Sequence, residues 1–324
     1  MTLSTEHHSL LESAHLALRQ YSLPPASELK LVNLSENATF KVTVEDGLFF
    51  ALRLHRPGYH SRAAIQSELA WLMALRNDGV AITPIPIVGK DGELIQQVDG
   101  RHVVLSGWED GIEPAIDQDL TKAFATLGDV AARMHQHVQR WKRPAQFERF
   151  TWDFETSLGE TAPHWGRWRD GMGVDIEKQK LFGRTVDLIG RRLADYGKSV
   201  QRFGLVHGDL RLANLLLDGD RVKVIDFDDS GFSWFMYDAA TPVSFHEHEP
   251  QVPALIEAWK HGYRRVMPLA KADETEIPTF IMLRRLLLVA WIGSHADTDL
   301  AKSMGVNYAE STTGLCEDYL AKFG

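Results

Sequence analysis

One stretch of the chain, residues 205–231, constrains the fold more than any other. Within it, two short apolar runs flank a turn at residues 218–220, where the central glycine supplies the positive φ that a tight hairpin requires. The sequence therefore predicts two short antiparallel strands in this stretch. Such a hairpin would fold Asp226, which follows the second strand, back beside Asn214, which precedes the first.

Three polar side chains would meet around this hairpin. Asp209 lies five residues before Asn214, in a loop entered from an apolar run. The pair Asn214 and Asp226 suits Mg²⁺, a hard ion that takes one or two protein oxygens and completes its shell with water and phosphate oxygens. Asp209 is then available to orient a hydroxyl group or accept its proton. This division of roles is that of phosphoryl transfer, in which positioning and charge neutralisation carry most of the catalysis.

Two motifs in this stretch resemble those of a known family. The sequence HGDLRLAN at residues 207–214, followed by IDFDD at residues 225–229, is similar to the catalytic and metal-binding motifs of the aminoglycoside phosphotransferase and homoserine/choline kinase superfamily. The resemblance covers the chain from about Leu31 to at least Tyr237.

The resemblance implies a fold class and two cofactors. The fold is expected to be α+β and two-lobed, like that of protein kinases. A small antiparallel-sheet lobe with one main helix would precede a larger, mainly helical lobe. The implied cofactors are ATP and Mg²⁺. Asp209 would be the catalytic base, with Asn214 and Asp226 as metal ligands.

Neighbouring residues receive supporting roles. His207 is expected to brace the loop by hydrogen bonds, because buried histidines are usually satisfied structural groups. Arg211, two residues after Asp209, would place a cation against the transferring γ-phosphate. By resemblance, Asp238 begins a helix and braces the catalytic loop. Aspartates near turns often only cap or bind water, and such a structural role is the alternative for the combination of Asp209, Asn214 and Asp226.

The first part of the chain has the period of strands. Runs at residues 28–34, 38–45 and 48–55 predict three strands, the last two joined by a hairpin at Asp46-Gly47. Ser35 and Asn37 lie between the first two runs, where kinase-like folds cover the ATP phosphates. The GxGxxG sequence is absent there. We expect Ser35, Asn37 and nearby backbone N–H groups to bind anionic oxygens.

Arg53 falls on the third of these strands, where protein kinases carry a phosphate-binding lysine. Some homoserine-kinase-like members of the superfamily have arginine here, and its planar fork suits phosphate. A helix predicted over residues 62–77 offers Glu68 as the carboxylate that would hold Arg53. A solvent-facing strand cation is the alternative for Arg53.

Three further strands are predicted at residues 84–88, 94–98 and 102–105. The pattern breaks at Trp108, which by resemblance begins the hinge. Backbone groups of Ser106 to Trp108 would contact the adenine edge. We therefore expect a nucleotide-binding lobe at residues 1–107 and a helical lobe with the catalytic loop and acceptor site at residues 108–324.

The remaining elements are predicted to be helices. A first amphipathic helix is expected at residues 5–20, with Thr5 as its N-cap. The others are expected at residues 120–138, 177–196, 251–268, 275–295 and 306–322.

Composition excludes several classes of protein. The net charge of −9 argues against a nucleic-acid partner, because phosphates require clustered Lys and Arg. We see no apolar run long enough to span a membrane and no secretory signal, so we expect a cytoplasmic protein. The single cysteine, Cys316, excludes an internal disulfide and a cysteine-based zinc site.

The leading hypothesis is an ATP- and Mg²⁺-dependent phosphotransferase that acts on a hydroxyl of a small molecule. Candidate acceptors are an amino alcohol, a homoserine-like compound, a sugar or an aminoglycoside. The short segment after Asp226 offers no platform for a peptide. The alternatives are a bacterial Ser/Thr protein kinase of the stress-response type and a nucleotide-binding scaffold without turnover. Oligomeric state is not predicted.

Overall fold

The computed structural model describes residues 3–34 and 37–324, which form two compact units. Unit 1 comprises Met1–Asp110 and Arg143–Glu148, and unit 2 comprises Gly111–Lys142 and Arg149–Gly324. The expected boundary at residues 107/108 lies three residues before this division. The segment at residues 143–148, which we had expected in the second lobe, belongs to unit 1. There the backbone N–H of Glu148 donates to Ser67 Oγ at 2.9 Å.

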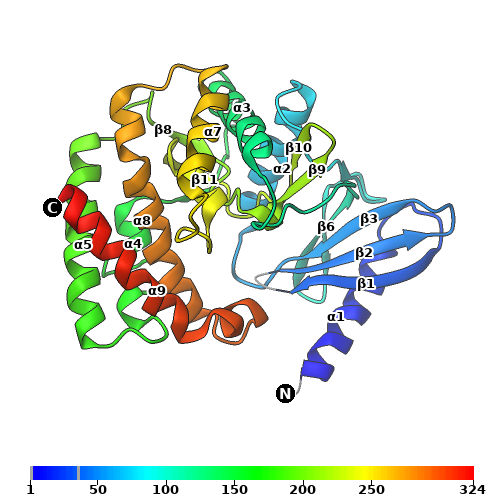
Figure 1. The fold of residues 1–324 in the computed structure, drawn as a ribbon. Coiled ribbons are helices and arrows are strands. Elements are labelled where there is room, and N and C mark those ends of the chain that lie inside the picture. Colours follow the sequence, from blue (N-terminus) through cyan, green and yellow to red (C-terminus); the bar gives the residue numbers. More distant parts are fainter. Residues whose placement is uncertain (1–2, 35–36) are drawn as a thin grey trace. The chain divides into compact units, whose positions relative to one another are not determined.

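Unit 1 is built on an antiparallel sheet with the strand order β1-β2-β3-β6-β4, to which β5 adds by pairing with β6 (Figure 1). The strands are β1 (Ala26–Leu34), β2 (Ala38–Val44), β3 (Phe49–Leu54), β4 (Pro86–Ile87), β5 (Ile95–Val98) and β6 (Arg101–Gly107). Along β2, buried residues alternate with half-buried ones, as expected for a strand with one face on the core. The strands predicted for this part of the chain are confirmed.

Two helices pack on this sheet. Helix α1 (Leu3–Leu18) buries Leu10 and Ala14 against a core that includes Phe40 of β2. Because α1 begins at Leu3, Thr5 lies inside the helix, and the prediction that it is the N-cap was wrong. Helix α2 (Arg62–Asn77) has the predicted bounds, and its N-cap Ser61 accepts a hydrogen bond from the third residue of the helix at 3.0 Å.

Unit 2 is mainly helical. Its long helices are α3 (Thr121–Val138), α5 (Ile176–Tyr196), α7 (Val252–Arg264), α8 (Lys271–Ser294) and α9 (Asp299–Phe323), and its short ones are α4 (Phe154–Leu158), α6 (Tyr237–Ala240), η1 (Trp168–Asp170), η2 (Leu212–Asn214) and η3 (Thr241–Val243). Two small sheets accompany them. One pairs β9 (Leu215–Asp218) with β10 (Arg221–Val224), and the other has the order β7 (Phe150–Thr151), β11 (Gly231–Trp234), β8 (Phe203–Val206).

Helices α3 and α7 approach each other closely at two glycines. A Cβ atom added to Gly262 of α7 would lie 1.7 Å from the carbonyl oxygen of Ala125, and one added to Gly128 of α3 would lie 2.0 Å from that of Trp259. No side chain fits at either position. The glycines therefore set the distance between the two helices, because each leaves room for the backbone of the other.

Helix α8 forms part of the core of unit 2. By length and composition it could cross a membrane, since an 18-residue window has a mean hydropathy of 1.4, but 78% of that window is buried inside the structure. Arg284 and Arg285 interrupt its apolar sequence, so α8 contains no uninterrupted apolar run of the length that was sought in the sequence. The apolar length of α8 is used to fill the interior between neighbouring helices. Helix α9 contains a kink at Gly305, which has φ 50° and ψ −147°. The part after the kink, residues 306–323, corresponds to the helix predicted at residues 306–322, and a short helical part at residues 299–304 precedes it.

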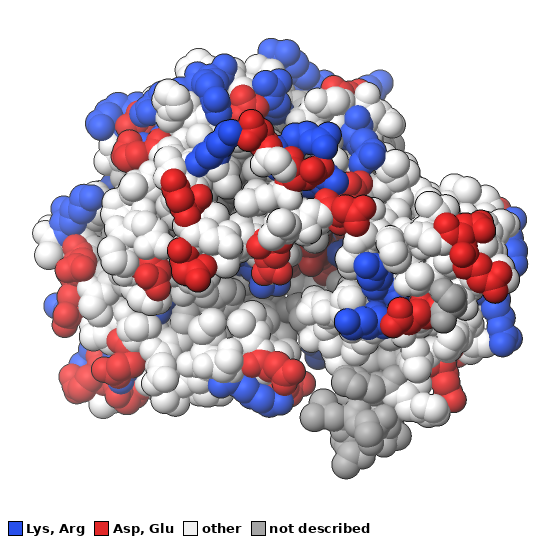
Figure 2. Space-filling view, turned by 45° about the vertical axis from the view of Figure 1, so that its right-hand side comes forward, with Lys and Arg blue, Asp and Glu red and all other residues white. Residues whose placement is uncertain are grey.

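Figure 2 shows charges of both signs interspersed on one face of the molecule. Lysine and arginine side chains on that face stand beside aspartate and glutamate side chains. The described residues of this face therefore present mixed charge and not a continuous basic stripe.

Candidate active site

The hairpin predicted around residues 218–220 is present. Strand β9 pairs antiparallel with β10, and the N–H of Ile225 donates to the carbonyl oxygen of Asn214 at 3.0 Å. Asp226 thus follows directly beside Asn214. Its φ of 60° places it in the left-handed region, which is uncommon for a residue other than glycine. Such backbone strain is typical of functional sites.

The loop that carries Asp209 is anchored by Asp238 of α6. The Asp238 carboxylate accepts hydrogen bonds from the backbone N–H groups of His207, at 3.1 Å, and Gly208, at 2.8 Å. A ring nitrogen of His135 on α3 lies 3.0 Å from the same carboxylate. All of these groups are buried. The structural role predicted for Asp238 is confirmed.

His207 braces the loop from within, as predicted. Its Nδ1 accepts from the N–H of Asp209 at 3.2 Å, and its Nε2 lies 3.2 Å from the carbonyl oxygen of Ile225. The tautomer with its proton on Nε2 satisfies both contacts. The side chain is fully buried, and this burial lowers the pKa of His207. The imidazole is therefore neutral and ties the loop to the hairpin.

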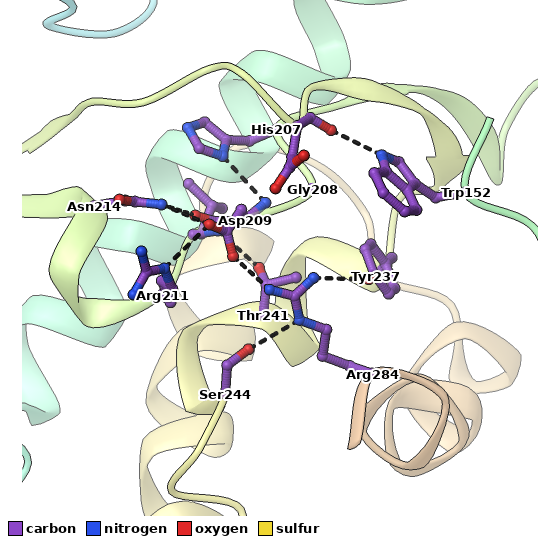
Figure 3. A network of polar contacts seen from close by, with 12 residues as sticks. Trp152, His207, Gly208, Asp209, Arg211, Asn214, Tyr237, Thr241, Ser244 and Arg284 are labelled. Carbon is purple, nitrogen blue, oxygen red and sulfur yellow. Dashed lines mark hydrogen bonds and ion pairs between the residues drawn. The ribbon is translucent and has the colours of Figure 1, made fainter. Parts of the chain in front are cut away.

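The carboxylate of Asp209 is held at both oxygens (Figure 3). Oδ2 accepts from Asn214 Nδ2 at 2.7 Å and from Arg211 Nε at 3.2 Å, and Oδ1 accepts from Nη2 of Arg284. Burial pushes the pKa of Asp209 upward, but the charges of Arg284 and Arg211 outweigh it and hold the pKa below its ordinary value. Asp209 is therefore ionised at neutral pH and fixed in direction.

Sequence reasoning missed Arg284, which lies on α8, 75 residues after Asp209. A signal was present. Arg284 and Arg285 stand together inside the apolar run of α8, and charged side chains in such a run need buried partners. The sequence alone did not identify which carboxylates would supply them.

The two predicted metal ligands offer oxygen donors. The Asn214 side-chain nitrogen donates to both the carbonyl and the carboxylate of Asp209, which leaves its Oδ1 for a cation. With the Asp226 carboxylate this makes a set of hard oxygen donors that suits Mg²⁺. In the part of the chain that the structure describes, no group of three His, Cys, Asp or Glu residues could hold a metal ion. Further ligands would have to come from water and substrate.

Arg53 and Glu68 meet within unit 1. Arg53 Nη1 lies 3.4 Å from Glu68 Oε1, with the Glu68 side chain only 5% exposed and that of Arg53 20% exposed. The predicted contact between strand β3 and helix α2 is confirmed. A solvent-facing cation on the strand is thereby disfavoured for Arg53.

The predicted phosphate-covering loop is placed only in part. Ser35 lies outside the described residues. Asn37 is buried, and its Oδ1 accepts from the backbone N–H of Arg56 at 3.2 Å, which ties the start of β2 to the end of β3. Its oxygen therefore has a structural partner, and only its amide nitrogen suits an anion.

The predicted hinge residues are largely engaged in the sheet. Ser106 stands opposite Ala51 on β3. The N–H of Gly107 donates to Ile85 O at 2.9 Å, and the N–H of Trp108 donates to Phe49 O at 3.1 Å. These two N–H groups are therefore already used within the sheet, and the predicted contact of adenine with other backbone groups of Ser106 to Trp108 stays a prediction. The N–H groups are used there because β6 continues to Gly107, two residues beyond the predicted strand.

Comparisons with known proteins point to one family. The family model described as "Phosphotransferase enzyme family" matches residues 29–272. A solved aminopropanol kinase, described as microcompartment-associated, is 43% identical, with 97% of this chain and 98% of that chain covered and a TM-score of 0.89. Amicoumacin kinase of Bacillus subtilis (strain 168) is 26% identical over 299 residues, covering 88% of this chain and 84% of that protein.

A second amicoumacin kinase, hAmiN, has been solved in complex with AMP-PNP, Ca²⁺ and Ami. It is 20% identical, with a TM-score of 0.76, and the match covers 99% of this chain and 96% of that chain.

Proposed function

Because the chain belongs to the phosphotransferase enzyme family, we propose that it transfers the γ-phosphate of ATP to the hydroxyl group of a small amino alcohol. The protein is a kinase with a small-molecule hydroxyl as acceptor, and a Ser/Thr protein kinase activity is not favoured. The observation that carries the acceptor class is the 43% identity over 97% of the chain to an aminopropanol kinase. The net charge of −9 is compatible with a cationic acceptor.

The proposed catalytic group is Asp209. The acceptor hydroxyl donates a hydrogen bond to the Asp209 carboxylate, which directs the hydroxyl oxygen toward the γ-phosphorus. As the new O–P bond forms and the bond to ADP breaks, the hydroxyl proton passes to Asp209. Arg211 supplies a cation to the transferring phosphoryl group. The lowered pKa of Asp209 suits an orienting group that receives the proton late in the reaction.

We assign the divalent ion to Asn214 and Asp226 and identify it as Mg²⁺. An amide oxygen and a carboxylate at the end of one hairpin are the hard donors that this ion prefers. When bound, Mg²⁺ neutralises the charge of the ATP phosphates. Asn214 and Asp226 would hold the ion, and both lie close in the chain to the loop that carries Asp209.

ATP itself is assigned to residues of unit 1. The Arg53 guanidinium, held by Glu68, would bind phosphate oxygens of ATP. Carbonyl oxygens of Ser106 to Trp108 would accept from the adenine amino group, because the N–H groups of Gly107 and Trp108 are already used in the sheet. Ser35 and the Asn37 amide would contact the phosphates.

The test is ADP release from ATP with a panel of acceptors. The panel contains 1-amino-2-propanol, ethanolamine, homoserine, an aminoglycoside and a peptide with serine. We expect the highest kcat/KM with an amino alcohol, and ³¹P NMR should identify an O-phosphorylated product in an amount equal to the ADP. The O-methyl ether of 1-amino-2-propanol, which lacks the hydroxyl, is the matched control and should give only the background rate.

Two results would overturn the proposal. A higher kcat/KM for homoserine or the aminoglycoside than for the amino alcohols would show that the proposed acceptor class is wrong. Tight ATP binding without ADP release for any acceptor would favour a nucleotide-binding scaffold without turnover.

A further inference from the structure

Helix α8 carries two adjacent buried arginines that contact different parts of unit 2. Arg285 pairs with Glu247, with Nη1 2.6 Å from Oε2, and also donates to Thr312 of α9 at 2.7 Å. Arg284 instead contacts the loop that carries Asp209. Arg284 is 2% exposed and Arg285 is 0% exposed, so both are buried.

Each nitrogen of the Arg284 guanidinium has its own oxygen partner. Nη2 donates to Asp209 Oδ1, Nη1 donates to the Tyr237 hydroxyl at 3.2 Å, and Nε donates to Ser244 Oγ at 3.1 Å (Figure 3). Because the guanidinium is planar, contacts in three directions fix its orientation. Arg284 is therefore a rigid donor toward Asp209.

These partners belong to the scaffold that anchors the loop. Tyr237 begins α6, whose next residue, Asp238, accepts from the loop backbone. Ser244 directly follows η3, whose first residue, Thr241, accepts from the loop N–H that follows Asp209 at 3.0 Å. Arg284 thus connects the Asp209 side chain to the elements that already hold its backbone.

The hydrogen bonds of Asp209 indicate where an acceptor can bind. Oδ2 receives two donors, from Asn214 and Arg211, whereas Oδ1 receives one, from Arg284, within the described chain. A carboxylate offers about four lone-pair directions. The lone pair that receives no donor within the described chain therefore lies on Oδ1, the oxygen that also accepts from Arg284.

We propose that Arg284 is a positioning residue for phosphoryl transfer, which fixes the Asp209 carboxylate so that the remaining lone pair of Oδ1 faces the acceptor hydroxyl. This inference depends on the proposed role of Asp209. Arg285, one residue further along the same helix, has no contact with the catalytic loop among its hydrogen bonds in the described chain and serves the packing of α8 with α9.

The test compares Arg284→Lys and Arg284→Met with Arg285→Lys as the matched control. Arg284→Lys keeps the charge but loses the fork, and we expect kcat to fall by about 10- to 100-fold, because a displacement of about 1 Å costs that much. The kcat of Arg284→Met should fall further than that of Arg284→Lys. The KM for ATP should stay unchanged in both, since the contacts of Arg284 all lie in unit 2. Arg285→Lys should lower the Tm and leave kcat per folded molecule unchanged.

The measurements are kcat and KM for each substrate, with the folded fraction determined from thermal melts of the same preparations. The acceptor-independent hydrolysis of ATP is measured in parallel, because water then takes the place of the acceptor. Absence of amino alcohol turnover by the wild type would refute the proposed acceptor, whereas the comparison of variants would still be made on the hydrolysis rate.

Equal kcat per folded molecule for wild type and both Arg284 variants would overturn the inference. The same conclusion would follow if Arg285→Lys lowered kcat as much as Arg284→Lys. If the Arg284 variants do not fold, Tyr237→Phe removes only one hydroxyl that holds the guanidinium. It should lower kcat without raising the KM for ATP, and an unchanged kcat in that variant would also refute the role of Arg284.

Discussion

The Asp209 carboxylate sits between two arginines and an asparagine amide, and this arrangement changes what a substitution there will do. Removing its charge takes from the buried Arg284 the carboxylate that its Nη2 contacts. Breaking a buried ion pair from one side is strongly destabilising, by about 3–5 kcal/mol. Asp209 is thus coupled to both catalysis and stability.

We predict two separable effects for Asp209→Asn. The kcat should fall by about 10²–10⁴-fold, because asparagine cannot take the proton. The Tm should fall as well, since Arg284 loses its counter-ion. ATP affinity, measured by calorimetry below the melting temperature, should stay nearly unchanged. A near-normal kcat would make Asp209 a loop brace, and a collapse of ATP binding in folded protein would place it among the metal ligands.

The residues of the site differ in how far the sequence identifies them. Asp209, Asn214 and Asp226 lie within one hairpin and its entry loop, so their spacing alone brings them together. Arg284 reaches the same carboxylate from a helix far along the chain, and such a contact has no local pattern. That the N–H groups at residues 107 and 108 are used within the sheet could not be read from the sequence, because the end of a strand depends on its neighbours more than on its own sequence.

At the scale of elements, the contact between α3 and α7 depends on glycine. We predict that Gly262→Ala destabilises the protein by about 1–3 kcal/mol or more, because its Cβ would collide with the backbone of Ala125 and overpacking forces such shifts. The matched control is Gly314→Ala in α9, where an added Cβ meets nothing within 4 Å.

The control should stabilise the protein by about 0.5–1 kcal/mol, the usual advantage of alanine over glycine inside a helix. Thermal and urea unfolding of both variants measure the difference. Equal effects of the two substitutions would contradict the close approach of α3 and α7.

The contact of β3 with α2 supports a prediction about coupling. Arg53→Ala should raise the KM for ATP strongly, and Glu68→Ala should raise it less, because Glu68 acts by orienting the arginine. The double variant should be little worse than Arg53→Ala alone, since residues in contact are not additive. Steady-state kinetics of the four proteins give the coupling energy, and fully additive losses would show that the two side chains act independently.

Long periodic segments were the elements most fully predicted. Helices α2, α3 and α5 lie within one residue of the expected bounds, because their apolar faces repeat at helical spacing. Strands β7 and β11 were not predicted. They are two and four residues long and form because β11 pairs with β7 on one side and with β8 on the other, so their own sequences carry little signal.

For the whole molecule, the predicted α+β, two-lobed protein-kinase-like fold is confirmed by the likeness to the solved aminopropanol kinase and amicoumacin kinase. The solved amicoumacin kinase hAmiN holds AMP-PNP and Ca²⁺, and for this chain the use of ATP and Mg²⁺ stays a proposal. The cytoplasmic location stays a prediction.

Ligand binding should be visible in the stability of the whole chain. A ligand at 100 times its Kd stabilises the folded protein by about 2.7 kcal/mol. We predict that ATP with Mg²⁺ raises the Tm more than ATP alone, and that Asp226→Ala removes this difference while the variant melts as cooperatively as the wild type. Thermal melts with and without Mg²⁺ measure it. A metal-dependent increase retained in Asp226→Ala would exclude Asp226 from the metal site.

The two neighbouring arginines of α8 have a consequence for how enzymes of this kind can be recombined. Successive helical residues point about 100° apart. Arg284 and Arg285 can therefore reach their different partners at the same time in only one orientation of α8 about its axis. A single inserted residue before them would turn both charges away from Asp209 and Glu247. A chimera that exchanges segments of unit 2 between relatives must therefore take α8, α6, η3 and the loop through Glu247 from the same parent protein.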